Sequence, residues 1–466
     1  MAQNFDVVVV GGGPGGYVAA IRAAQLGFST ACVEAKHLGG ICLNWGCIPT
    51  KSLLRNAEIW ETLQHADEYG VSFDNLSFDF SKIIARSRGI ADKMSKGVAF
   101  LFKKYNVTHI PAWGKLLGGT TVGLFDKDGG KTDEIHAKHV ILATGARPRS
   151  IPGITIDRKR VISYFEAMSL PERPQSLIVL GAGAIGVEFA TVWNAYGSQI
   201  TMVEMLPAIL PLQDAEISAE LDKQYRRRKI KTLTGHRVLS VKKTDTGVEV
   251  VVSDGSEEKT LTADQALVAI GFRPNSANLG LEALGVELDK RGYIAIDDKM
   301  ATNVPGIYAI GDVTGKLLLA HTASAQAMIC AEAMAGQETH ALDYKMIPSA
   351  VFSHPQVASF GWTEADAAKE GIEVKVGRFP FLPNGKALGL GENVGFVKII
   401  AEAASGRIIG AHMIGPDVSE LLPELTLAAN QGLTAAEIGQ NVHTHPTLSE
   451  VLMEAAHALE GHAIHI

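Results

Sequence analysis

Hydrophobic runs, glycine-rich turns and small-residue stretches follow one another in an order that predicts the first folding elements. An apolar strand runs from about Asp6 to Val10, the stretch Gly11–Gly16 follows it, and an alanine-rich helix continues to about Leu26. A second apolar stretch then closes at Glu34. Strand, tight turn, helix and strand in this order predict a βαβ unit of a parallel sheet, and therefore an α/β fold.

The turn of this unit has the spacing Gly-x-Gly-x-x-Gly, with Gly11, Gly13 and Gly16. In a dinucleotide-binding turn the first glycine allows the sharp bend, the second lets the backbone approach a diphosphate, and the third lets helix and strand pack closely. Glu34 lies where an acid accepts hydrogen bonds from ribose hydroxyls. The strand before, the helix after and the acid make the pattern specific, which the glycines alone would not be.

The same pattern returns 170 positions later. Its equivalent residues are Gly181, Gly183, Gly186 and Glu204, and each unit is followed by an apolar strand that ends in glycine, at Thr144-Gly145 and at Gly271. An internal duplication that yields two dinucleotide-binding domains is the simplest interpretation. Two such domains indicate electron transfer between two dinucleotides.

Neighbouring residues indicate which nucleotide each domain binds. Glu204 offers a carboxylate to a ribose 2′-hydroxyl, and Met205-Leu206-Pro207 after it provide no arginine for a 2′-phosphate. We therefore expect NAD rather than NADP in the second domain. The first domain leads directly into a pair of cysteines, so we expect it to hold the flavin, as FAD.

A later strand ends at Gly311-Asp312 and is expected to return to the first domain. We assign Asp312 to a ribityl hydroxyl of FAD, and capping of the next helix is the alternative. That helix is expected to run from Leu319 to about Ala335. Its N-terminus would stabilise negative charge on a reduced flavin ring.

Cys42 and Cys47 lie within the stretch Gly39–Lys51 and are the candidate redox pair. Residues five apart in a regular α-helix have Cα atoms roughly 8.6 Å apart, which exceeds the roughly 7 Å that a disulfide bridges. Gly46 adds backbone freedom and Pro49 lacks a backbone N–H, so we expect a distorted first turn and a disulfide at a helix N-terminus. A zinc site needs four neighbouring ligands, and a merely structural disulfide does not suit a chain with four cysteines and no secretion signal.

The pattern changes to alternating strands from about Met346 onward. Two apolar runs, residues 395–400 and 407–414, flank Ala404-Ser405-Gly406, which is typical of a hairpin. The chain ends with an amphipathic helix through Leu459. A mixed α+β third domain is therefore expected.

Composition narrows the possible partners and location. The chain has 466 residues, 46% of them hydrophobic, and a net charge of -7, which makes nucleic acid an improbable partner. No apolar run approaches the roughly 20 residues needed to span a bilayer. The first strand begins too early for a signal peptide, so we expect a cytoplasmic protein without a membrane partner.

Together these motifs make the chain resemble the pyridine nucleotide-disulfide oxidoreductases over its whole length. The motifs are Gly40-x-Cys42-x-Asn44-x-Gly46-Cys47-x-Pro49-x-Lys51 and His445-Pro446-Thr447-x-Ser449-Glu450. Leu43-Asn44, Ile48-Pro49-Thr50-Lys51, Glu204 and the stretch 206–214 are most similar to the members that oxidise dihydrolipoamide.

The resemblance implies two Rossmann-like dinucleotide-binding domains plus a C-terminal α+β dimerisation domain. Their expected bounds are residues 1–150 with 274–345 for FAD, 151–273 for NAD, and 346–466 for the subunit interface. An obligate homodimer is implied, which oxidises dihydrolipoamide with NAD⁺ as acceptor. The substrate is expected on a lipoyl carrier domain of a 2-oxo acid dehydrogenase complex.

The resemblance also gives roles to single residues. Cys42 would meet the substrate, and Cys47 would lie against the flavin. His445, contributed by the other subunit, would be the base, and Glu450 would orient it. Lys51 would lie near the flavin N5 and pair with Glu188 on the NAD-domain helix; no metal ligand is expected.

Two local alternatives concern the end of the chain. Thr447-x-x-Glu450 before an apolar helix is also a capping box. If the Glu450 carboxylate accepts a hydrogen bond from the Thr447 N–H, we expect that it cannot also hold the His445 imidazole. His443 is the rival base, but it lacks the following proline of His445.

Other functions are also conceivable for such a chain. A reductase of the glutathione or mercuric type would run from NADPH, which Glu204 disfavours, and the mercuric type would carry an extra C-terminal cysteine pair. A non-enzymatic flavoprotein subunit would need none of Cys42, Cys47 and His445. The chain departs from the family at Thr322, where lysine is frequent, and at Trp45, where a small aliphatic residue is usual.

Overall fold

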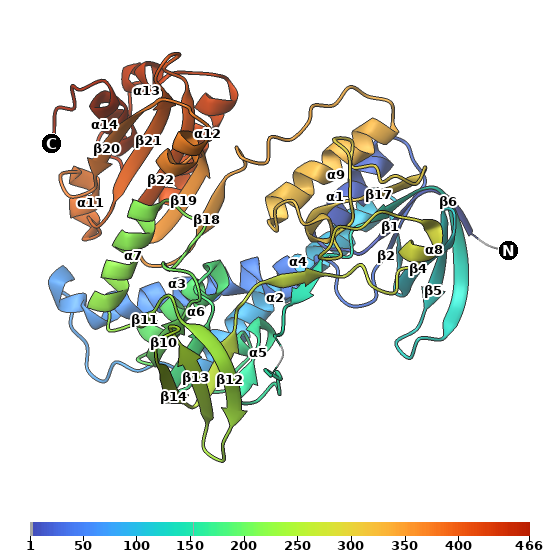
Figure 1. Ribbon diagram of the computed structural model, residues 1–466, viewed down its shortest axis with the longest axis horizontal. Coiled ribbons are helices and arrows are strands. Elements are labelled where there is room, and N and C mark those ends of the chain that lie inside the picture. Colours follow the sequence, from blue (N-terminus) through green and yellow to red (C-terminus); the bar gives the residue numbers. More distant parts are fainter. Residues whose placement is uncertain (1–2, 152) are drawn as a thin grey trace. The chain divides into compact units, whose positions relative to one another are not determined.

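The computed structural model describes residues 3–151 and 153–466, which form two compact units whose elements are labelled in Figure 1. Both units draw on distant parts of the sequence. The first comprises Met1–Leu53, Asp79–Arg149 and Gly271–Tyr344, and the second comprises Leu54–Phe78, Ser150–Ile270 and Lys345–Ile466.

A seven-stranded sheet forms the centre of the first unit, in the order β3-β2-β1-β6-β5-β4 with β17 also paired to β6. The strands β3, β2, β1, β6 and β17 pair in parallel, whereas β4, β5 and β6 pair antiparallel. The bounds are β1 (Gln3–Val10), β2 (Thr30–Val33), β3 (Thr108–Ile110), β4 (Trp113–Gly118), β5 (Thr121–Phe125), β6 (Lys131–Leu142) and β17 (Ile307–Ala309). β7 (Ala146–Pro148) and β16 (Phe272–Pro274) form a separate antiparallel pair.

Several helices belong to the same unit as this sheet. They are α1 (Pro14–Gln25), α2 (Gly40–Trp45), the start of α3 (Cys47–Gln64), α4 (Phe80–Lys104), α8 (Leu281–Leu284) and α9 (Ala320–Met334), with the 3₁₀ helix η2 (Gly311–Thr314). Val7, Val8 and Val9 of β1 are fully buried, as expected for a parallel strand covered on both faces. The predicted first βαβ unit, the return of the strand before Gly311 and the helix near 319–335 are confirmed.

The second unit holds two separate five-stranded sheets. One is β11-β10-β9-β15-β8, all parallel, and the other is β18-β19-β22-β21-β20, all antiparallel. The parallel strands are β8 (Val161–Ile162), β9 (Ser176–Leu180), β10 (Gln199–Val203), β11 (Lys231–Leu233) and β15 (Gln265–Val268). The second unit also contains a separate three-stranded sheet, formed by β12 (Arg237–Lys243), β13 (Val248–Ser253) and β14 (Glu258–Ala263).

The antiparallel sheet contains the predicted hairpin. Its strands are β18 (Ser349–Val351), β19 (Gln356–Gly361), β20 (Val374–Pro380), β21 (Phe396–Glu402) and β22 (Ile408–Gly415). The hairpin prediction is confirmed, because β21 and β22 pair on either side of the Ala404–Gly406 turn. The helices of this unit are η1 (Ala66–Tyr69), α5 (Tyr164–Ala167), α6 (Ala184–Ala195), α7 (Ala215–Arg227), α10 (Glu364–Lys369), α11 (Gly385–Leu390), α12 (Val418–Asn430), α13 (Ala435–Gln440) and α14 (Glu450–Leu459).

A buried lysine joins α7 to the antiparallel sheet within this unit. The side chain of Lys398 on β21 is 1% exposed, and its Nζ lies 2.9 Å from Asp214 and 2.8 Å from Glu216, with Glu364 as a third partner. Arg378 of β20 donates two hydrogen bonds to Glu216. The hydrogen bonds from Arg378 and from Lys398 lower the pKa of Glu216 to about 2.

No helix within residues 3–151 and 153–466 combines the length and the hydropathy that a membrane crossing requires.

Candidate active site

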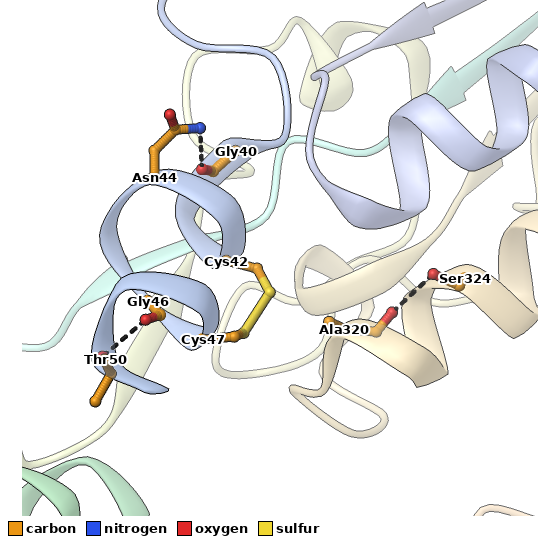
Figure 2. The surroundings of a disulfide bond; sticks show 8 residues. All are labelled: Gly40, Cys42, Asn44, Gly46, Cys47, Thr50, Ala320 and Ser324. Atoms are coloured by element: carbon orange, nitrogen blue, oxygen red, sulfur yellow. Dashed lines mark hydrogen bonds between the residues drawn. A yellow bond between two sulfur atoms is a disulfide. The ribbon is translucent and has the colours of Figure 1, made fainter. Parts of the chain in front are cut away.

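The disulfide joins two helices at a break in the chain (Figure 2). Cys42 is the third residue of α2, Cys47 is the first residue of α3, and their Cα atoms are 4.7 Å apart. Gly46 separates the helices with φ -146° and ψ -116°, so the predicted departure from regular helix is confirmed. The expected position at a helix N-terminus is confirmed, because Cys47 begins α3 and Cys42 lies in the first turn of the separate short helix α2.

Buried polar side chains fix this break. The Asn44 amide donates to the Leu38 and Gly40 carbonyls, each at 3.0 Å. The Thr50 hydroxyl donates to the Gly46 carbonyl at 2.7 Å, as Figure 2 shows. These side-chain bonds add to the backbone bond from the Thr50 N–H to the Gly46 carbonyl, and they hold the two helix ends on either side of the break.

Trp45, the unusual residue between the cysteines, packs against a cation. The Arg88 guanidinium of α4 lies 4.1 Å from the centre of the indole ring, and it also donates to the Asn44 carbonyl. Burial lowers the pKa of Arg88. The indole therefore anchors α2 to α4 beside the disulfide, through a cation–π contact.

The two glycine turns have nearly the same geometry. A Cβ on Gly11, where φ is +105°, would lie 2.3 Å from the Ala143 carbonyl oxygen, and one on Gly181, where φ is +100°, would lie 2.4 Å from that of Ala269. A Cβ on Gly16 would lie 1.9 Å from the Gly11 carbonyl oxygen, and one on Gly186 would lie 2.1 Å from that of Gly181. The first and third glycines are thus required by close backbone approach.

The middle glycines face open space. No heavy atom outside the neighbouring backbone lies within 4 Å of a Cβ built on Gly183, and for Gly13 the only one is the Gly40 Cα at 3.9 Å. Each glycine precedes a helix of 12 residues, α1 or α6. Free N–H groups at a helix N-terminus beside open space fit the diphosphate of a dinucleotide.

The acidic residues repeat as well. One Glu34 oxygen accepts from the Gly12 N–H and the other from the Lys36 N–H, each at 2.8 Å. Glu204 accepts from the Ala182 and Leu206 N–H groups, each at 2.9 Å. A carboxylate has about four acceptor positions, so these bonds orient both groups and leave capacity for ribose hydroxyls.

Asp312 has a half-buried carboxyl group. Burial raises its pKa to about 6, and no hydrogen bond to its side-chain oxygens is found among residues 3–151 and 153–466. It lies inside η2, and neither η2 nor α9 has a side-chain N-cap, so the capping alternative is wrong. A half-buried carboxyl group in this state fits the hydroxyls of a ribityl chain.

Two of the predicted strand-end residues, Thr144 and Gly145, are hydrogen-bonded to Asn275, which the sequence pattern did not single out. Thr144 donates its hydroxyl to the Asn275 carbonyl at 2.8 Å, and the Asn275 amide donates back to the Thr144 carbonyl. Gly145 accepts from the Asn275 N–H. Gly145 and Gly271 both have positive φ with no atom near an added Cβ. An asparagine directly after a short strand was the only sequence signal.

Near the C-terminus, the Glu450 carboxylate both holds the His445 imidazole and accepts from the Thr447 N–H. These two roles were expected to exclude each other. Its Oε1 lies 2.8 Å from the His445 Nδ1, and its Oε2 accepts from the Thr447 N–H at 2.9 Å. The expectation that a folded-back Glu450 loses the imidazole was therefore wrong, because the two oxygens are used separately. Burial raises the pKa of Glu450, but the bonds from Thr447 and His445 outweigh it and lower the pKa.

The two candidate histidines differ in exposure. The His445 side chain is 78% exposed, and the only hydrogen bond found for its ring within the described residues is at Nδ1. The His443 side chain is 3% exposed, with Nε2 3.0 Å from Glu424 and Nδ1 2.9 Å from the Asn441 carbonyl oxygen. Both ring nitrogens of His443 are therefore engaged.

The remaining candidates are Glu188, Lys51 and the two other cysteines. Glu188 lies in the second turn of α6, is buried, and accepts from the Phe352 N–H at 3.0 Å. Lys51 in α3 is half-buried. Cys32 and Cys330 are buried free thiols whose pKa values are raised by burial. Within the described residues no three His, Cys, Asp or Glu side chains gather as metal ligands.

Two family models match nearly the whole chain. The model for pyridine nucleotide-disulphide oxidoreductases matches residues 5–327, and the model for the dimerisation domain of these enzymes matches residues 347–456. The chain belongs to this family. It is therefore an oxidoreductase with a disulfide redox centre.

Known relatives extend over the same length. The dihydrolipoyl dehydrogenase of Mycobacterium leprae is 50% identical over 465 residues, which cover 99% of each chain. That of Zymomonas mobilis is 46% identical over 468 residues and covers 100% of each chain. The crystal structure of LpdA from Mycobacterium tuberculosis has a TM-score of 0.91 at 29% identity, covering 98% of this chain and 100% of that one.

The cofactors of this family are FAD and NAD, and the two glycine turns with their acidic residues fit them. The duplicated glycine turns have open middle positions, and the half-buried carboxyl group of Asp312 has no hydrogen-bond partner among the described residues. The predicted fold class and the predicted cofactors are therefore confirmed.

Proposed function

We propose that this chain oxidises dihydrolipoamide to lipoamide with NAD⁺ as acceptor, through FAD and the Cys42–Cys47 disulfide. The observation that carries the proposal is the disulfide itself, held at a helix break within the unit that contains the first glycine turn. The full-length likeness to dihydrolipoyl dehydrogenases supports this substrate over other disulfides.

The first half of the reaction is the oxidation of dihydrolipoamide by the Cys42–Cys47 disulfide. His445 of the partner subunit takes a proton from a substrate thiol, and the thiolate attacks the Cys42 sulfur. The Cys42–Cys47 bond breaks, and Cys47 leaves as a thiolate. The second substrate thiol attacks the sulfur bound to Cys42 and closes the lipoamide ring, and Cys42 leaves as a thiol with the proton that the attacking thiol gives up. The substrate has then lost two electrons and the enzyme has gained them.

Bound FAD supplies the two-electron relay between this dithiol and NAD⁺. We assign Gly11, Gly13, Gly16, Glu34, Lys51, Thr144, Gly145, Gly311 and Asp312 to FAD, and Gly181, Gly183, Gly186, Glu188, Glu204 and Gly271 to NAD. The proposed domains are residues 1–150 with 274–345, residues 151–273, and residues 346–466.

The dimerisation domain supports a homodimer. We propose that the dimer is required for activity, because the base comes from the partner subunit. The substrate is proposed to arrive on a lipoyl carrier domain of a 2-oxo acid dehydrogenase complex, in the cytoplasm.

Steady-state turnover of the purified protein tests the proposal. We expect flavin-coloured protein that reduces NAD⁺ with dihydrolipoamide, and much weaker reduction of glutathione disulfide by NADPH. Cys42→Ser should abolish the first reaction, because no disulfide can form. Colourless protein that takes up no flavin, or equal activity of Cys42→Ser, would refute the assignment.

A further inference from the structure

Arg88 of α4 is a half-buried cation without a carboxylate partner. Its Nη1 is covered by protein atoms and has no hydrogen bond within the part of the chain that the structure describes. Burial lowers the pKa of Arg88, and no acid among the described residues opposes that shift. The contacts that it does make, with the Trp45 ring and the Asn44 carbonyl oxygen, are to uncharged groups. Burial of an unpaired charge is unfavourable, so this guanidinium gains most when a negative charge forms nearby.

Both contacts of the guanidinium are made inside the loop that the disulfide closes. Asn44 and Trp45 lie between Cys42 and Cys47. The Arg88 Nη2 donates at 2.5 Å to the Asn44 carbonyl, which lies in the last turn of α2, where carbonyls lack partners within the helix. Because two residues span at most about 7 Å, the positive charge lies on the order of 10 Å from the sulfurs.

The helix α4 holds the chain on both sides of the helix break. The hydroxyl of Ser87, which is fully buried, donates to the Pro49 carbonyl of α3 at 2.9 Å. Further along α4, the Ser95 hydroxyl donates to the Leu38 carbonyl before α2 at 2.8 Å. These contacts do not involve the sulfurs, so we expect them to persist when the disulfide opens. The guanidinium of Arg88 then keeps its place beside the loop in both redox states.

No carboxylate around the pair competes for Arg88. The helix α2 carries no charged side chain. On the first turns of α3 and α9 and within one turn of Arg88 on α4, the other charged or titratable side chains are Lys51, Arg86, Asp92 and His321. Asp92 is the only acid among them, and it is paired with Lys96 at 2.6 Å. In the proposed dimer, His445 of the partner subunit would be added to this set.

We propose that the Arg88 guanidinium stabilises the thiolate that forms when the Cys42–Cys47 disulfide is reduced, and that it thereby raises the reduction potential of this disulfide. Reduction adds two electrons and one proton to the pair, so that Cys47 becomes a thiolate and Cys42 a thiol. The inference rests on the proposed function, in which dihydrolipoamide supplies both electrons. Of its two thiol protons, one goes to Cys42 and the other to His445 of the partner subunit. The guanidinium meets its counter-charge only in this reduced state.

Arg88→Gln tests the inference, because glutamine keeps a donor for the Asn44 carbonyl and removes the charge. The full-length holoprotein is equilibrated without oxygen in mixtures of reduced and oxidised dithiothreitol, and its free thiols are then alkylated and counted by mass spectrometry. Half reduction of the disulfide should require an about tenfold higher ratio of reduced to oxidised dithiothreitol, the effect of one unit charge roughly 10 Å away at an effective dielectric constant of about 20.

Two further variants and a control separate the charge from a structural role. Arg88→Lys keeps the charge and should need nearly the wild-type ratio. Arg88→Met, a second variant without the charge, should shift the ratio as Arg88→Gln does. Lys96→Gln is the matched control, because it removes a cation from the same helix that is 76% exposed and therefore screened by salt. It should leave the ratio unchanged.

The possible outcomes decide between the two roles. A wild-type ratio in both variants without the charge, or an equal shift in Arg88→Lys, would overturn the inference. A wild-type disulfide that dihydrolipoamide does not reduce would instead refute the proposed function, so the two failures are distinguishable.

Discussion

At the scale of single residues, the exposed imidazole of His445 has the properties of a base that meets substrate. Its Nδ1 is held by one oxygen of Glu450, and the other oxygen is held by the Thr447 N–H. A carboxylate on Nδ1 fixes the tautomer that leaves Nε2 as an acceptor. His443, buried and bonded at both nitrogens, is suited to holding the loop instead.

His445→Gln should lower turnover of dihydrolipoamide by at least about a hundredfold, the usual scale of general base catalysis. His443→Gln is the matched comparison, and it should change thermal stability more than turnover. Steady-state rates with dihydrolipoamide and NAD⁺ measure both. A larger rate loss in the His443 variant would reassign the base.

The raised pKa of the half-buried Asp312 carboxyl group predicts a pH dependence of the stability of the flavin-free chain. Burial raises its pKa from 3.8 to about 6, so the folded state binds the proton more tightly than the unfolded state. The contribution of Asp312 to stability should therefore fall as the pH rises from 3.8 to about 6, and Asp312→Asn should remove that contribution. Denaturant unfolding at several pH values measures it. Asp298→Asn, at an exposed position, is the control. Curves of stability against pH that run parallel for Asp312→Asn and the wild type would contradict the prediction.

At the scale of elements, the two βαβ units repeat the same backbone contacts in separate sheets. The third glycine of each turn touches the carbonyl of the first glycine, at Gly16 and Gly186. Helix and strand approach so closely there that any side chain would push the helix away. The repeated contacts therefore give one test for each cofactor.

Gly186→Ala should impair NAD⁺ binding while the protein keeps its flavin, because only the second turn is disturbed. Gly16→Ala should instead lose FAD. The flavin content of purified protein and the Michaelis constant for NAD⁺ distinguish the two variants. Loss of flavin in the Gly186 variant would show that the two turns do not act separately.

The buried Lys398 predicts a second property of the elements. Lys398→Met should lower the free energy of unfolding by about 3–5 kcal/mol, because Asp214, which is 4% exposed, would stay buried without its cation. Arg378→Met is the control, since that side chain is 41% exposed. The loss of the Arg378 guanidinium should lower the free energy of unfolding by about 1 kcal/mol or less. Equal losses in urea unfolding would contradict this assignment.

At the scale of the whole molecule, the proposed site needs two chains. The disulfide belongs to the first unit and His445 to the second, and the dimerisation domain contains the histidine. A dimer related by two-fold symmetry would then have two equivalent sites, each with cysteines from one chain and a base from the other.

Mixed dimers test this arrangement. Cys42→Ser and His445→Gln chains, each nearly inactive alone, should regain about a quarter of wild-type activity when dissociated together and reassembled, since half the dimers would hold one intact site. Wild-type chains treated in the same way give the reference. If the base came from the same chain as the cysteines, mixing would restore nothing.

Local sequence rules were enough for the glycine turns, the acids at the strand ends and the interrupted helix at the disulfide. Each depends on sterics within a few residues, such as the positive φ of Gly11 or the missing N–H of Pro49. The hairpin around Ala404–Gly406 is equally local. The sequence therefore determined the fold class and the redox centre.

Only the tertiary structure decided how buried polar groups are satisfied, because their partners come from distant segments. Asn275 reaches Thr144, Lys398 reaches Asp214, and both Glu450 oxygens are used although one was expected to exclude the other. Spacing along the chain determines which groups are present, and packing determines which of them remain available to a ligand.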